Sequence, residues 1–144
     1  MSSNRPSWNE YFMKIATLAS SRSSCNRLNV GCVIVKDNHI LATGYNGFLS
    51  GCPHQSIVLN NHEQATVHAE QNAISCAAKF GVSLKDSICY CTHYPCINCF
   101  KVLVAAGIKK IYYNNNYRNS FIVHTLAKQA NIEIIHLEEK KENP

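Results

Sequence analysis

Apolar residues recur at helical spacing in four stretches of the chain, and short apolar runs lie between them. The predicted helices cover residues 8–22, 67–80, 95–106 and 119–130. The predicted strands cover residues 30–35, 39–43, 88–92, 108–113 and 132–137. The elements therefore follow the order α-β-β-α-β-α-β-α-β.

Local signals mark the ends of these segments. Ser7 and Glu10 form a capping-box pattern before the first helix, and Gly81 and Gly107 end the second and third. Asp37-Asn38 supplies the turn of an antiparallel hairpin. A long loop runs from Gly44 to about Thr66, and a loop of that length in a compact domain is usually functional. The tail over residues 138–144 is polar and is expected to fray.

The alternation of strands and helices predicts the fold class. After the hairpin it favours a mostly parallel sheet with right-handed crossovers and helices on both faces. With the hairpin included, we expect an α/β fold with a five-stranded mixed sheet sandwiched by helices. No linker, repeat or low-complexity stretch divides the 144 residues, so residues 1–144 are predicted to form one domain.

Composition excludes several classes of protein. Apolar residues make up 46% and charged residues 16%, which excludes a disordered segment. The net charge of +5 suits anionic small molecules but is too small to predict nucleic-acid binding. The apolar runs are shorter than the ~18 residues of a membrane span, and the polar start shows no secretory signal. We therefore expect a cytoplasmic protein without membrane or nucleic-acid partners.

The eight cysteines suggest either disulfides or metal ligands, and the absence of a secretory signal together with a core of adequate size favours metal. Their spacing indicates which cysteines are the ligands. Cys96 and Cys99, in Pro-Cys-x-x-Cys at a predicted helix start, lie one turn apart on one face. That spacing suits Zn–S bonds of about 2.3 Å, and a helix N-terminus favours the thiolate. His68 supplies a third ligand from a neighbouring helix. Three protein ligands leave a fourth position for water, which is typical of a catalytic zinc.

Glu70 follows His68 by two residues and therefore projects beside the metal. A carboxylate there can take a proton from zinc-bound water and pass it to a substrate nitrogen. His-x-Glu followed by Pro-Cys-x-x-Cys is the signature of zinc-dependent nucleobase deaminases. A zinc ribbon needs a second Cys-x-x-Cys, and a redox pair leaves His68 and Glu70 unexplained. Cys89 and Cys91 point to one face of a strand and are interpreted as core packing.

The zinc motif and the segments around it resemble deoxycytidylate (dCMP) deaminases of the cytidine deaminase superfamily. The resemblance extends from about Arg27 to Ile135. It is carried by Val-Gly-Cys-Val-Ile-Val at 30–35, Thr-Gly-Tyr-Asn-Gly at 43–47, Val-His-Ala-Glu-Gln-Asn-Ala-Ile at 67–74, Thr-His-Tyr-Pro-Cys-Ile-Asn-Cys at 92–99 and Ala-Gly-Ile at 106–108. The zinc motif is specific only for the superfamily, whereas the segments 43–47 and 67–74 narrow the resemblance to the dCMP deaminase branch.

The resemblance implies hydrolysis of dCMP to dUMP and ammonia, which supplies dUMP for thymidylate synthesis. Glu70 would move protons to N3 and to the leaving amino group. Asn46 would contact the sugar, Tyr117-Arg118 the nucleotide, and Ala69 belongs to the same substrate site. Arg118 suits a phosphate through its bidentate fork. The plainer alternatives are a turn residue for Asn46 and a solvated loop side chain for Arg118.

The resemblance also implies a hexamer that dCTP activates and dTTP inhibits, both with Mg²⁺. Gly44 and Gly47 would let such a nucleotide approach the backbone closely, and Arg22 and Arg27 are further phosphate candidates. Some members carry a second, structural zinc. The spare residues that could ligate it here are Cys25, Cys52, His54 and His62.

Several alternatives stay open at this point. A permissive phosphate pocket would accept dCTP as substrate rather than as effector. A tRNA adenosine deaminase shares both zinc motifs but should show a more basic face than this chain. Free-nucleoside cytidine deaminases usually have Cys in place of His68. A non-catalytic zinc module would not need Glu70.

Overall fold

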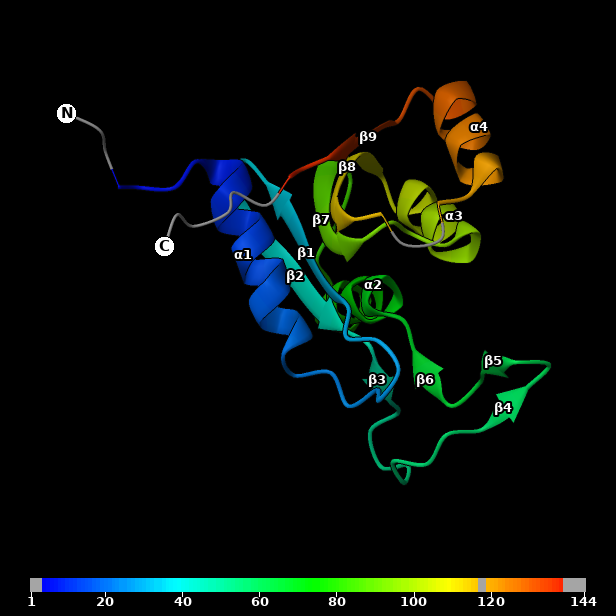
Figure 1. The fold of residues 1–144 in the computed structure, drawn as a ribbon. Coiled ribbons are helices and arrows are strands. Elements are labelled where there is room, and N and C mark those ends of the chain that lie inside the picture. Colours follow the sequence, from blue (N-terminus) through cyan, green and yellow to red (C-terminus); the bar gives the residue numbers. More distant parts are fainter. Residues whose placement is uncertain (1–3, 117–118, 139–144) are drawn as a thin grey trace.

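A five-stranded sheet forms the centre of the molecule (Figure 1). The computed structural model describes residues 4–116 and 119–138. In spatial order the strands are β2 (His39–Tyr45), β1 (Gly31–Lys36), β7 (Ser87–His93), β8 (Ile108–Asn115) and β9 (Glu133–His136). The mixed α/β fold expected from the sequence is confirmed.

The strand directions agree with the predicted mixed sheet. β1 pairs antiparallel with both β2 and β7, whereas the strands after the hairpin form the parallel pairs β7–β8 and β8–β9. The β2–α2–β7 connection is a crossover that leaves β2 and β7 running in the same direction. Because β1 lies between these two strands and opposes β2, it must oppose β7 as well.

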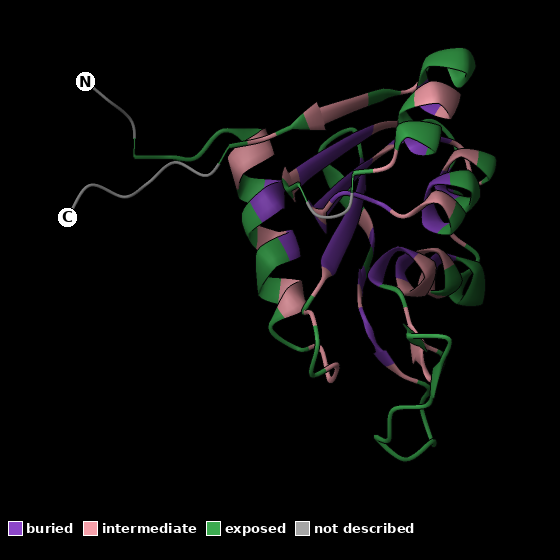
Figure 2. Cartoon of the chain, turned by 45° about the vertical axis from the view of Figure 1, so that its right-hand side comes forward, coloured by how far each residue is buried: buried purple, intermediate pink, exposed green. Residues whose placement is uncertain are grey.

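Helices cover both faces of the sheet, as predicted. Helix α1 (Trp8–Ser20) lies on one face, and α2 (Ala69–Phe80), α3 (Ile97–Ala105) and α4 (Phe121–Ala130) lie on the other (Figure 1). Alternate residues of β1 supply the two cores: Val33 packs with Phe12 of α1, and Ile34 packs beneath α2 and α3. Figure 2 shows the buried residues along the sheet and on the inward sides of the helices.

The helix ends follow the capping signals with small shifts. Ser7 Oγ accepts a hydrogen bond from the N–H of Glu10 at 3.2 Å, which caps α1. Gly81 ends α2 with φ of +68°, a conformation that glycine adopts without strain. The second helix begins at Ala69 rather than Val67, because Val67 pairs with Gly47 in a short ladder. His68 and Cys96 are the extended N-cap residues of α2 and α3.

The predicted loop over residues 44–66 contains four short strands. β3 (Gly47–Phe48) pairs with β6 (Thr66–Val67), and β4 (Val58–Leu59) pairs with β5 (His62–Glu63). The β4–β5 hairpin projects from the body of the molecule (Figure 1). Within the described part of the chain, no helix is long and apolar enough to cross a membrane.

Helix α2 crosses β2 in direct backbone contact. A Cβ at Gly44 would lie 2.2 Å from the carbonyl oxygen of Ala69 and 2.5 Å from the backbone nitrogen of Ala73. Glycine is therefore required at this crossing. The helix itself, and not a ligand, occupies the space that the missing side chain leaves, and the contact fixes the first turn of α2 over the sheet.

Candidate active site

The N-termini of α2 and α3 bring three metal-ligating side chains together. Nδ1 of His68 lies 3.6 Å from Sγ of Cys96 and 3.3 Å from Sγ of Cys99. The three ligand atoms all lie within 4.8 Å of one another. The side chains proposed as zinc ligands therefore converge, although His68 and Cys96 are 28 residues apart in the sequence.

The electrostatics of the group suit metal binding. Hydrogen bonding from Cys99 and the adjacent His68 ring lower the pKa of Cys96 to about 4, although burial opposes the shift. Contact with Cys96, burial and the Glu70 carboxylate raise the pKa of Cys99. The Cys96 sulfur raises the pKa of His68, against the effect of burial. One imidazole nitrogen and two cysteine sulfurs form a donor set that fits Zn²⁺.

Gln71 fixes the backbone at His68. The N–H of His68 donates to Oε1 of Gln71 at 3.1 Å, so the residue three positions into the helix holds its N-cap. No role was predicted for Gln71. A glutamine three residues after an N-cap is a recognisable signal, but histidine is not a usual N-cap residue.

Glu70 lies in the first turn of α2, beside the three ligand side chains. Its side chain is 4% exposed, and Cys91 donates its thiol hydrogen to Oε1 with 3.0 Å between sulfur and oxygen. The effect of Glu70 on the pKa of Cys99 places its carboxylate next to that ligand as well. A buried carboxylate adjacent to a metal-type donor set can exchange protons with a substrate bound there.

Cys89 and Cys91 are fully buried in the core beneath α2 and α3, which confirms their interpretation as core residues. The hydrogen bond from Cys91 to Glu70 was not predicted. None of the eight cysteines, which all lie in the described part of the chain, forms a disulfide.

Asn46 is 8% exposed and ties the end of β2 to the segment before β1. Its Oδ1 accepts from the N–H of Val30 at 2.8 Å, and its Nδ2 donates to the carbonyl of Leu28 at 2.6 Å. One amide hydrogen and one lone pair remain available for a ligand, so the sugar contact stays a prediction. Tyr117 and Arg118 lie outside the described residues.

The four candidate ligands of a second zinc lie apart from the first site. Cys25 is half-buried, Cys52 and His62 are exposed, and His54 stacks on Phe48 with 5.2 Å between ring centroids. Among the described residues, His68, Cys96 and Cys99 are the one group of three or more such side chains with ligand atoms within 4.8 Å. The second zinc stays a prediction.

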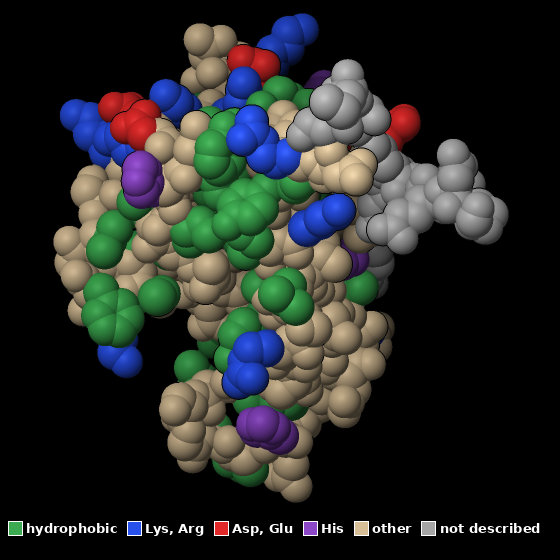
Figure 3. All heavy atoms as spheres, turned by 90° about the vertical axis from the view of Figure 1, so that its left-hand side faces the viewer, with side chains coloured by type: hydrophobic (Ala, Val, Ile, Leu, Met, Phe, Trp, Pro, Cys, Tyr) green, Lys and Arg blue, Asp and Glu red, His purple; other side chains and the backbone are tan. Residues whose placement is uncertain are grey.

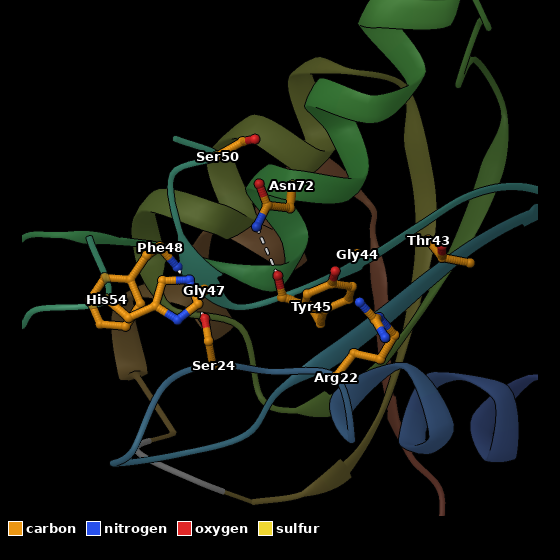
Figure 4. A pocket seen from close by; sticks show the side chains of 10 residues that line it. All are labelled: Arg22, Ser24, Thr43, Gly44, Tyr45, Gly47, Phe48, Ser50, His54 and Asn72. Atoms are coloured by element: carbon orange, nitrogen blue, oxygen red, sulfur yellow. Dashed lines mark hydrogen bonds between the residues drawn. The ribbon is translucent and has the colours of Figure 1, made fainter. Parts of the chain in front are cut away.

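A pocket of about 490 Å³ opens beside Asn72 of α2 and Tyr45 of β2 (Figure 4). Asn72 of α2 donates to the carbonyl of Tyr45 at 2.8 Å, and the Arg22 guanidinium lies 5.6 Å from the centre of the Tyr45 ring. None of the three metal-ligating residues lines it. The lining residues are Arg22, Ser24, Thr43, Gly44, Tyr45, Gly47, Phe48, Ser50, His54 and Asn72.

The fold is a mixed sheet with helices on both faces, and a histidine, two cysteines and a glutamate meet at two helix N-termini. This combination is characteristic of zinc-dependent nucleobase deaminases. The chain belongs to the cytidine and deoxycytidylate deaminase family, whose zinc-binding region matches residues 6–115.

Individual relatives cover the chain to different extents. ComE operon protein 2 of Bacillus subtilis is 41% identical over 93% of this chain and 73% of its own length. The deoxycytidylate deaminase of Saccharomyces cerevisiae is 39% identical over 90% of this chain, which spans only 45% of the yeast protein. The crystal structure of dCMP deaminase from cyanophage S-TIM5 with dCMP and dUMP has a TM-score of 0.83 and 36% identity, covering 94% of this chain and all of that one.

Proposed function

We propose that this chain hydrolyses dCMP to dUMP and ammonia, and so supplies dUMP for thymidylate synthesis. The observation that carries the proposal is the buried Glu70 carboxylate beside His68, Cys96 and Cys99. It is supported by the likeness, over nearly the whole chain, to a phage enzyme whose structure holds both dCMP and dUMP.

His68, Cys96 and Cys99 would hold the zinc ion. When bound, zinc lowers the pKa of a coordinated water and so provides a nucleophile near neutral pH. Glu70 accepts one proton from the attacking water and passes it to N3 of the cytosine ring. It then accepts a second proton from the hydroxyl group added at C4 and passes it to the leaving amino nitrogen, which departs as ammonia. Its burial keeps this transfer away from bulk solvent.

Substrate recognition is assigned to residues outside the zinc motifs. Asn46 would use its remaining amide hydrogen or lone pair on the sugar, and Arg118 would form a bidentate pair with the phosphate. Tyr117 and Ala69 complete the proposed substrate site. The position of Asn115 supports this arrangement, because it pairs with His93 at the carboxyl ends of β8 and β7, two residues before Tyr117. Ligands bind at this end of parallel strands in open α/β sheets.

The pocket beside Tyr45 is proposed to bind the regulatory nucleotides dCTP and dTTP, with Mg²⁺ on their phosphates. Arg22 offers a positive charge to the phosphates, and the Phe48 and Tyr45 rings offer apolar surface to a base or sugar (Figure 4). The pocket volume of about 490 Å³ is within the range of small-molecule sites.

We also propose that the chain assembles with copies of itself, with a hexamer as the expected size. Trp8, Tyr11 and Leu18 of α1 are exposed, and Figure 3 shows apolar side chains gathered on the α1 side. Val58 and Leu59 are exposed on the projecting hairpin. Apolar surface of this kind is typical of protein–protein contacts. Light scattering tests the assembly, and a monomer at all concentrations would contradict it. The cytoplasmic location stays a prediction.

The proposed reaction is tested by an ultraviolet deamination assay on the zinc-loaded protein. The substrates are dCMP, CMP, dCTP, deoxycytidine and an adenosine-containing tRNA hairpin. We expect dCMP to react fastest and deoxycytidine roughly a hundredfold more slowly, because an arginine without its phosphate is left unpaired. Fastest reaction of dCTP would make that nucleotide the substrate. Reaction of the hairpin alone would replace the proposal with tRNA deamination, and no reaction would favour a non-catalytic zinc module.

A further inference from the structure

A buried thiol of the sheet contacts the carboxylate proposed to move the protons. Cys91 of β7 is 0% exposed, and its Sγ lies 3.0 Å from Oε1 of Glu70 on α2. Strand and helix are packed through this contact, with the sheet below and the first turn of α2 above. Cys91 is not one of the three residues that could ligate the metal.

The Cys91 side chain is held in place by the neighbouring strand. Cys32 of β1 is the direct cross-strand partner of Cys91. Both thiols are fully buried in one core cluster. Close packing of this kind leaves few alternative rotamers, so the Cys91 sulfur is held in position before substrate binds.

Cys91 remains a protonated thiol, as a donor must. Its contact with Cys32 lowers the pKa, but burial and the nearby Glu70 carboxylate outweigh that effect and raise the pKa to about 12. The carboxylate can only accept, so the thiol hydrogen lies between sulfur and Oε1. A thiol is a weak donor, but a charged acceptor in an apolar core strengthens the bond.

We propose that Cys91 is a positioning residue for deamination, whose S–H fixes Oε1 of Glu70 and leaves the second carboxylate oxygen to exchange protons with the substrate. The inference rests on the proposed function of Glu70. A glutamate side chain has three rotatable bonds, and holding one oxygen limits the orientations of the other. Removal of the thiol should therefore slow proton transfer more than it weakens substrate binding.

The kinetic test uses Cys91→Val, which fills the volume without a donor, and Cys91→Ser, which restores one. The matched control is Cys89→Val, because Cys89 is equally buried on the same face of β7. We expect Cys91→Val to lower kcat by roughly 10–100-fold with little change in KM and full zinc content, as is typical for groups that orient a site from outside. Cys91→Ser should recover most of kcat, and Cys89→Val should keep the wild-type kcat.

Two kinetic outcomes would overturn the inference. One is a wild-type kcat in Cys91→Val. The other is an equal loss in Cys91→Val and Cys89→Val, which would mean that packing alone is responsible. Melting temperatures of all variants show whether each is folded.

An infrared measurement tests the contact without any turnover. The S–H stretching band that disappears in Cys91→Ser identifies Cys91, and hydrogen bonding to Glu70 should hold that band at low frequency. In Glu70→Gln the acceptor is uncharged, so we expect the band to move to higher frequency. A band that does not move would refute the contact. A band that moves in a protein that deaminates none of the nucleotides would instead refute the proposed function and leave the contact standing.

Discussion

The metal centre and the pocket beside Tyr45 lie near the same few turns of α2 but are built in different ways. In the metal centre, three ligand atoms within 4.8 Å come from the starts of two helices. The pocket is open and is assembled from the segment that follows α1, from β2, from the loop after β2 and from α2, with Arg22 and the His54 ring among its polar groups. The metal centre therefore comes from two short motifs, whereas the pocket is made of segments that only the fold brings together.

One helix connects the two regions. His68 and Glu70 lie at the start of α2. Asn72, two residues after Glu70 on the same helix, donates to the carbonyl of Tyr45 in the pocket. The close crossing at Gly44 joins the same part of α2 to β2. Displacement of Tyr45 by a ligand would therefore act on the helix that holds Glu70.

The largest expected effect comes from Glu70→Gln, which changes only the proton-transfer group of the metal centre. An amide cannot carry the proton, so we expect turnover of dCMP to fall by about 10²–10⁴-fold while the fold and the zinc remain. Zinc content and deamination rate are measured on one preparation. Near-normal activity would mean that another group carries the proton.

A smaller effect is expected when substrate recognition is changed without touching the metal centre. Arg118→Ala should lower dCMP turnover roughly a hundredfold, because the phosphate loses its charged partner. The slow reaction of deoxycytidine, which has no phosphate, should hardly change. The turnover of dCMP and of deoxycytidine is measured in parallel for the wild type and the variant. An equal loss of turnover on both substrates would assign Arg118 a structural role.

The smallest effect concerns the pocket. Arg22→Ala removes its guanidinium, and loss of a charge-assisted contact of about 1.5–3 kcal/mol should raise the dCTP and dTTP concentrations needed for half-maximal response by roughly 10–100-fold. Titration of the deamination rate with each nucleotide and Mg²⁺ measures this shift. Unchanged half-maximal concentrations would exclude Arg22 from effector binding.

The difference between the two regions also explains what the sequence could predict. His68, Cys96 and Cys99 were identifiable because their spacing is governed by helix geometry and by the chemistry of zinc. The order of elements followed from the periodicity of apolar residues. The antiparallel pairing of β7 with β1 was not predicted, since it depends on which strand the crossover skips.

Contacts between segments that are distant in the sequence could not be predicted either. Strand alternation placed Cys89 and Cys91 on the core face, but only the packing of α2 on the sheet shows that Cys91 meets Glu70. The backbone contacts of Asn46 with Leu28 and Val30 likewise join residues 16 to 18 positions apart. Such contacts depend on the loop conformation, for which local patterns give no signal.

The proposed reaction depends on one zinc ion held by His68, Cys96 and Cys99, and metal analysis is the direct test of this dependence. Zinc per chain is measured in the wild type, in Cys99→Ser and in Cys76→Ser, a control that removes a thiol of α2 outside every proposed site. We predict that Cys99→Ser loses one zinc ion per chain and that Cys76→Ser keeps the wild-type content. Wild-type zinc content in Cys99→Ser would contradict the account.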